Sequence, residues 1–149
     1  MRFTFSEFVI KKLWLVLLFS FLFVPHVFAE EGGCPGEEAA EKGFDPIKEF
    51  HHAIAPVWHK AYPAKDFDAM MAAAPEFEKA LEGVMKLEPK FTDAEKAKAF
   101  TDSRDALAAV VANYSKAVAA PDQDLVYELL PKVHEQFEAT ASAILASDG

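Results

Sequence analysis

Cysteine is scarce in this chain, which has a single one, Cys34, among 149 residues. A fold built on intrachain disulfides is therefore excluded. The sequence has no CxxCH segment, which excludes covalently attached c-type haem, and it lacks glycine-rich phosphate loops, HExxH and EF-hand patterns. No nucleophilic triad can be read from its serines, histidines or its cysteine. We therefore predict a protein that is not an enzyme.

Positive charge is also in short supply. Fifteen lysines and arginines face 24 aspartates and glutamates, which gives a formal net charge of −9. Such a chain repels the phosphates of nucleic acids, so we expect no nucleic acid partner. The length suits one domain with one hydrophobic core.

The first 29 residues have the pattern of an export signal. A basic region with Arg2, Lys11 and Lys12 precedes the apolar run 13–24, and Val-Phe-Ala at 27–29 supplies small residues for cleavage. The run is shorter than the roughly 20 residues that span a bilayer. We predict a signal peptide over 1–29 and a periplasmic or secreted protein that is free of the membrane after cleavage.

Residues 30–43 read EEGGCPGEEAAEKG and show no apolar periodicity. This composition predicts a flexible acidic leader. Cys34 lies within it, and two interpretations stay open. It is either an exposed thiol or the site of a disulfide that links two copies into a homodimer.

The rest of the chain, 44–149, is predicted to be one all-α domain. Apolar residues recur at helical spacing over 45–62, 65–87, 92–119 and 121–146. Four amphipathic helices joined by short connections are typical of an antiparallel up-down-up-down four-helix bundle.

Capping residues mark the expected helix ends. Asp45 is the expected N-cap of the first helix, and Pro63 is expected to end it. Thr92 with Glu95 suggests a capping box for the third helix. Three prolines fall inside helices, where each either opens a cavity by kinking or is a tolerated bend: Pro56, Pro75 and Pro131.

Each predicted helix has an expected apolar stripe. The expected inward positions are Phe44, Ile47, His51, Ile54, Trp58 and Ala61; Phe67, Met70, Ala74, Phe77, Leu81 and Val84; Phe100, Leu107, Val110, Val111, Tyr114 and Val118; and Val126, Leu130, Val133, Phe137, Ala141 and Ile144.

Histidines are the residues with the clearest chemistry. His51, His52 and His59 lie on the first predicted helix, and His134 lies on the fourth with Glu138 one turn later. In an antiparallel pairing of these helices, His59 falls level with His134, and Glu138 falls between His52 and His59. Imidazole and carboxylate ligands together suit Zn, Cu, Ni or Fe. The alternative is that these side chains are ordinary core or solvated residues.

An exported four-helix bundle with a ligand histidine on its last helix resembles the cytochrome b562 and cytochrome c′ group. The likeness covers 44–146 in topology and length. It implies haem b bound without covalent attachment, through His134 together with His59 or His51. The methionine ligand of cytochrome b562-like proteins has no counterpart on the first helix here, and His134 lies in mid-helix.

The segment IAPVWHKAYPAKD resembles a PLWH-type stretch of small exported bacterial helical proteins, and VHEQFE resembles their fourth-helix motif at His134 and Glu138. The resemblance implies metal binding. The matching positions of the first segment are Pro56, Val57, Trp58, His59, Pro63, Lys65 and Asp66.

These observations favour a periplasmic bundle that binds a transition metal ion for storage, buffering or sensing. Two alternatives stay open: an electron carrier that binds haem b, and a cofactor-free bundle that binds a partner.

Overall fold

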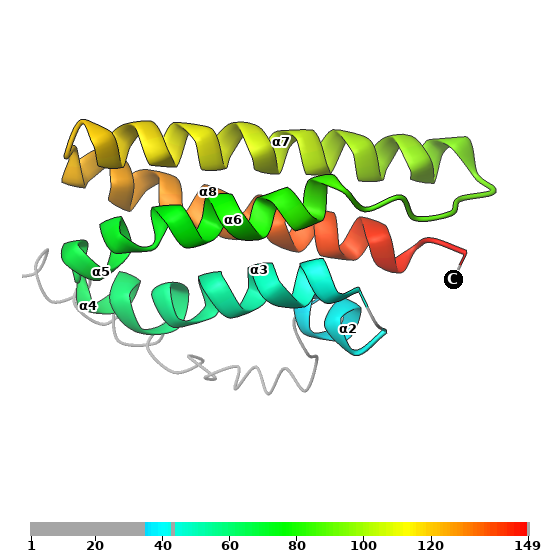
Figure 1. The fold of residues 1–149 in the computed structure, drawn as a ribbon, viewed down its shortest axis with the longest axis horizontal. Helices are drawn as coiled ribbons and strands as arrows, with labels where there is room; N and C mark the ends of the chain where they lie inside the picture. The colour runs from blue at the N-terminus through cyan, green and yellow to red at the C-terminus, as the bar shows by residue number, and fades with distance from the viewer. Residues whose placement is uncertain (1–34, 43, 149) are drawn as a thin grey trace, which may run out of the picture. The chain divides into compact units, whose positions relative to one another are not determined.

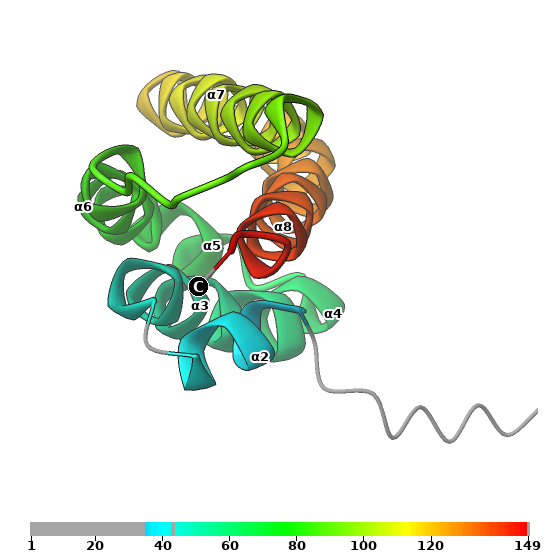
Figure 2. The same cartoon turned by 90° about the vertical axis from the view of Figure 1, so that its right-hand side faces the viewer.

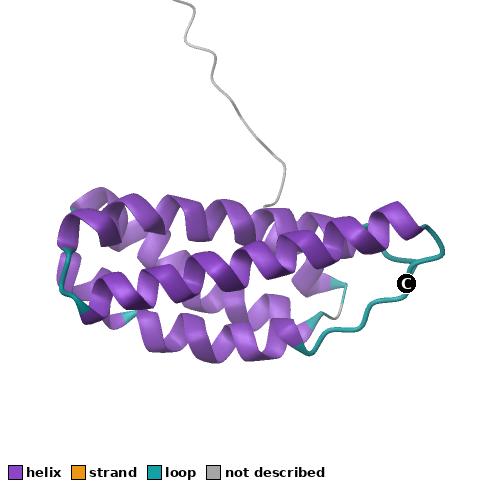
Figure 3. Cartoon of the chain, turned by 90° about the horizontal axis from the view of Figure 1, so that it is seen from above, coloured by secondary structure: helices purple, strands orange, loops and turns teal. Residues whose placement is uncertain are grey.

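A computed structural model describes residues 35–42 and 44–148 of the chain. The predicted signal peptide (1–29) and Cys34 lie outside the described residues. Every regular element within them is a helix, and none of these helices is long and apolar enough to cross a membrane (Figures 1 and 3). The elements are α2 (Pro35–Glu41), α3 (Asp45–Pro56), the π-helical turn η1 (Val57–Ala61), α4 (Tyr62–Ala64), α5 (Phe67–Ala72), α6 (Ala74–Met85), α7 (Ala94–Ala119) and α8 (Gln123–Leu145).

The longer helices pack along one another. α7 lies against α8 over the most extensive contact, α3 packs on α6, and α6 packs on α7. The short helix α2 contacts both α3 and α8, and the end-on view of Figure 2 shows it beside α3. One hydrophobic core is shared by all of them.

The inward stripe of α8 agrees with the sequence prediction at all six positions, from Val126 to Ile144. The predicted stripes of α5–α6 and α7 have most of their members buried, while Phe67, Leu81, Val110 and Val118 are only partly buried. The prediction for the first helix was less accurate. Phe50 and Val57 are buried there, whereas Phe44, His51 and Trp58 are partly buried.

The reason is the helical period. Ile47, Phe50, Ile54, Val57 and Ala61 step by three and four, and they form the buried line. His51 and Trp58 each follow a buried position by one residue, so both lie on one flank of that line. This flank carries the candidate site.

Two predicted ends of the first helix are wrong. Asp45 is the first helical residue rather than the N-cap, since Phe44 holds the cap position without a side-chain hydrogen bond. Pro63 does not end the helix, because it lies in the first turn of α4, where a proline is tolerated. The chain leaves the helix at Lys65, whose left-handed conformation (φ 52°) lets the Asp66 N–H donate to the Ala61 carbonyl at 2.9 Å.

The interior prolines act differently from one another. Pro56 is followed by η1, where the Tyr62 N–H donates to the carbonyl of Val57, a wider turn than an α-helix makes. Pro75 lies in the first turn of α6, so the predicted helix 65–87 is divided at Ala73 into α5 and α6. Pro131 lies inside an uninterrupted α8.

Aspartates cap α7 and α8, the two longest helices within the described residues. Asp93, not the predicted Thr92, caps α7 by accepting from the N–H groups of Glu95 and Lys96. Asp122 caps α8 by accepting from the Leu125 N–H at 3.0 Å.

The predicted flexible leader is wrong for part of its length, because Pro35–Glu41 forms α2. Gly36 explains how this short helix docks, since a Cβ there would meet the Phe137 ring at 2.5 Å. Only a residue without a side chain lets the backbone approach α8 so closely. Ala39 is fully buried beside it.

Replacement of Gly36 by alanine is therefore expected to destabilise the docked α2. Overpacking against the Phe137 ring costs about 1–3 kcal/mol, measured as the free energy of unfolding in urea. Gly83→Ala in α6 is the matched control, because its Cβ would approach Pro46 only to 3.2 Å and alanine has the higher helix propensity. A Gly36→Ala protein as stable as the Gly83→Ala protein would contradict the docking described here.

Candidate metal site

The centre of the candidate site is a pair of side chains on α8. His134 and Glu138 lie one turn apart, with 3.8 Å between Nε2 and Oε1, and their side chains are 22% and 19% exposed. The structure thus brings together the two residues that the sequence pattern singled out on this helix.

The carboxylate of Glu138 lacks ordinary partners. Neither of its oxygens makes a hydrogen bond within the part of the chain that the structure describes, and both are buried. Burial raises the pKa of Glu138, and the backbone N–H of Gly36 opposes that rise. Unpartnered buried carboxylate oxygens are uncommon in proteins and need an explanation, such as a water or an ion.

The imidazole of His134 is held between charged and aromatic neighbours. Trp58 stacks on it, with ring centroids 4.3 Å apart and 15° between the planes. Burial lowers the pKa of His134 most, and the charges of His59 and His51 lower it further. His134 is therefore neutral at pH 7, so its contact with Glu138 is not an ion pair. Two more imidazoles lie close enough to His134 to affect its charge.

His51 belongs to the same cluster. It is partly buried and stacks on Phe137, with centroids 6.1 Å apart. Burial lowers the pKa of His51, Glu37 raises it, and His52 and His59 lower it. Glu37 lies on α2, so this helix adds a carboxylate near the imidazoles.

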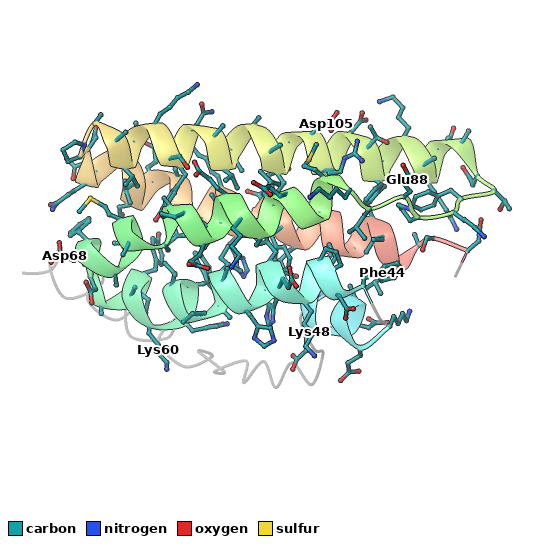
Figure 4. The ribbon with its side chains drawn as sticks, in the orientation of Figure 1. Phe44, Lys48, Lys60, Asp68, Glu88 and Asp105 are labelled. Atoms are coloured by element: carbon teal, nitrogen blue, oxygen red, sulfur yellow. The ribbon has the colours of Figure 1, made fainter. Side chains whose placement is uncertain are left out.

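His52 and His59 are exposed. His59 lies in η1, and its charge lowers the pKa values of both His51 and His134. The charge of His52 lowers the pKa of His51. His52 lines a groove of about 740 Å³ between α3 and α5–α6, and a smaller one of about 350 Å³ beside Glu37. Figure 4 shows Lys60 on the outer side of the first helix, pointing away from the other helices, whereas Lys48 lines the smaller groove with Glu37 and Glu41 of α2. His52 is thus a predicted ligand that opens onto these two grooves.

Complete metal coordination is not formed by these side chains as they stand. Among residues 35–42 and 44–148, no three His, Cys, Asp or Glu side chains are arranged to hold one metal ion. His134 and Glu138 supply two adjacent donors, with His51 and His59 next to them.

Glu37 and Gly36 were missed by sequence reasoning because residues 30–43 were assigned to a leader. A signal was present: Pro35 at the first helical position is followed by Glu37 and Glu38 in the first turn. Proline and acidic residues are both favoured at the start of a helix.

Searches against protein-family models, curated proteins and solved structures found no match to this chain. The resemblance to the cytochrome b562 and cytochrome c′ group therefore rests on the sequence pattern alone.

Proposed function

We propose that the protein binds a transition metal ion through His134 and Glu138, with His51 and His59 as further imidazole ligands. The observation that carries the proposal is the carboxylate of Glu138, whose buried oxygens make no hydrogen bond within residues 35–42 and 44–148 and lie one helical turn from His134, an imidazole whose pKa His59 and His51 lower in turn. A cation bound there would satisfy both carboxylate oxygens and the unshared imidazole nitrogens at once.

Two features favour coordination. The lowered pKa values of His134 and His51 keep both imidazoles neutral, which is the form that binds a metal. His59 is exposed, so its side chain can turn toward His134 without disturbing the core. Nitrogen and carboxylate donors suit Zn, Cu, Ni or Fe.

We also propose that α3–α4, α5–α6, α7 and α8 form an antiparallel up-down-up-down four-helix bundle with α2 added. In support, the chain turns back at Lys65, between α6 and α7, and between α7 and α8 (Figure 1). Metal and cofactor sites in such bundles are built from side chains on facing helices, here the first and the fourth. With the predicted signal peptide, this gives an exported metal-storage, buffering or sensing protein.

Calorimetric titration with Zn²⁺ tests the proposal. We expect the metal-free protein to take up one ion per chain. His134→Ala should weaken binding by more than the roughly 10–100-fold that outer-shell substitutions cost, since it removes a direct ligand. His52→Ala is the matched control and should bind like the unmodified protein.

The same titration has an expected pH dependence. Affinity should fall once the imidazoles protonate, and the lowered pKa values of His51 and His134 move that loss below their usual value of 6.5. Full Zn²⁺ affinity in His134→Ala would contradict the proposed ligand set.

A further inference from the structure

A row of oxidisable aromatic side chains leads away from His134. The indole of Trp58 stacks on the Tyr62 ring with centroids 5.0 Å apart and 17° between the planes. Tyr62 in turn stacks on Tyr127, at 4.5 Å and 18°. Together with the Trp58–His134 contact, these form one continuous stack across α8 and the first helix.

The local backbone explains the stack. Trp58 lies in η1, and Tyr62 is the first residue after that turn. The wide turn and the start of α4 hold the rings of Trp58 and Tyr62 one above the other. Tyr127 lies seven residues, about two turns, before His134 on α8. Ring pairs at these separations and angles are in direct packing contact.

Residue type sets this stack apart from the core. The core packs phenylalanines on one another, as in Phe50 on Phe137 at 5.1 Å and Phe50 on Phe77 at 5.9 Å. Of 14 phenylalanines, three tyrosines and two tryptophans in the chain, the stack uses two tyrosines and one tryptophan and no phenylalanine. Each of these three rings can therefore lose one electron, which the phenylalanine rings of the core do not do readily.

The stack runs from the candidate site to the surface. Trp58, Tyr62 and Tyr127 are all partly buried, so none belongs to the fully closed core. Lys65 lies over the Tyr127 ring, with Nζ 5.7 Å from the centroid. Tyr127 is therefore the end of the row farthest along the stack from His134, and it is partly open to solvent, as Trp58 and Tyr62 are.

We propose that Trp58, Tyr62 and Tyr127 form a one-electron relay that carries an oxidising equivalent away from the His134 end of the stack. A one-electron oxidant, such as a diffusing radical or an oxidised transition ion, takes an electron from Trp58, and the indole N–H proton passes to water. Tyr62 then gives one electron to the indolyl radical and loses its phenolic proton, while Trp58 regains a proton.

The second transfer repeats this chemistry. Tyr127 gives an electron and its phenolic proton, Tyr62 is restored, and the radical stands at Tyr127, where an external one-electron reductant can quench it. Each transfer within the stack moves one electron and one proton, and the relay as a whole consumes one equivalent of the oxidant and one of the reductant. The relay itself needs no metal. Only its coupling to an ion at His134 rests on the proposed function.

Pulse radiolysis of the metal-free chain with azide radical as the oxidant tests the relay. Azide radical takes one electron from an indole and becomes azide. The protein used is the full chain with the substitution Trp14→Phe, which leaves Trp58 as its one indole. We expect the indolyl radical to decay by a first-order process, independent of protein concentration, as phenoxyl absorption appears.

Tyr62→Phe keeps the ring but removes the oxidisable phenol, and it should slow this transfer by about tenfold or more. Tyr114→Phe is the matched control. Tyr114 is buried, donates to the Met70 carbonyl at 2.7 Å and contacts Phe77 rather than the stack, so its loss should leave the rate unchanged. Circular dichroism and melting curves confirm that each variant is folded.

Two results would overturn the relay. One is an indolyl radical whose decay is the same in Tyr62→Phe as in the parent. The other is a transfer that depends on protein concentration. Because the experiment contains no metal, its outcome is separate from that of the Zn²⁺ titration.

Discussion

Replacing Glu138 by glutamine is expected to make the metal-free protein more stable while it removes metal-dependent stabilisation. The carboxylate oxygens are buried and make no hydrogen bond among the residues that the structure describes, which is an arrangement that costs free energy. Glutamine has nearly the same shape and no charge, so we expect the free energy of unfolding to rise by about 1–2 kcal/mol at neutral pH. A stabilising effect would show that the buried carboxylate costs stability when no metal is bound.

The sign of this effect depends on pH. Burial raises the folded-state pKa of Glu138 above its usual 4.5, so the native state binds the proton more tightly than the unfolded state does. The carboxylate therefore destabilises the fold as pH rises from about 4.5 through the folded-state pKa, and the full penalty applies above it. The advantage of glutamine should vanish at low pH, where both side chains are neutral.

Urea unfolding with and without Zn²⁺ measures both parts of the prediction. Saturating metal at about 100 times its dissociation constant should stabilise the parent by about 2.7 kcal/mol and leave Glu138→Gln unaffected. Glu135→Gln, an exposed position on the same helix, is the control and should change stability by less than about 0.5 kcal/mol. A Glu138→Gln protein that is less stable than the parent and still responds to metal would contradict the account.

Replacing Phe137 by alanine is expected to have the largest effect on stability. Phe137 is fully buried, and its ring stacks on Phe50 at 5.1 Å and on His51 at 6.1 Å. Its ring also packs closely against Gly36 of α2. Loss of a fully buried phenylalanine leaves a cavity and should lower the free energy of unfolding by about 3–5 kcal/mol.

A double-mutant cycle with Gly36→Ala makes this prediction specific. The alanine Cβ at position 36 would fill space that the Phe137 ring occupies, so the cost of Gly36→Ala should nearly disappear in the Phe137→Ala background. Phe91→Ala, at a partly buried loop position, is the control and should be much less costly. Additive costs for the two substitutions would show that Gly36 does not pack on Phe137.

How far the sequence predicted this structure depended on the strength of the local signal. The six inward positions of α8 follow a regular three-four spacing, and all six are buried. The His134–Glu138 pair was predictable for the same reason, since positions one turn apart on a helix are always neighbours. Helical content throughout was likewise expected from periodicity.

Other features depended on tertiary contacts that a periodic pattern does not contain. The short helix α2 is held by the approach of Gly36 to Phe137, a residue about 100 positions later. On the first helix, Phe50 and His51 lie three and four residues after Ile47, so the helical spacing allows either to continue the buried line. Phe50 is the one that is buried, because its ring packs against Phe77 and Phe137. The wide turn after Pro56, which stacks Trp58 on His134, had no signal beyond the proline itself.

The measurement that tests the central claim most directly is the metal content of the chain purified without a histidine tag, with its absorption spectrum. We predict a near-stoichiometric transition metal in the unmodified protein, loss of that metal in His134→Ala, and no Soret band. A protein that contains no metal, takes up none when Zn²⁺, Cu²⁺, Ni²⁺ or Fe²⁺ is added, or keeps its metal in His134→Ala would contradict the account. A Soret band would instead support the haem b alternative.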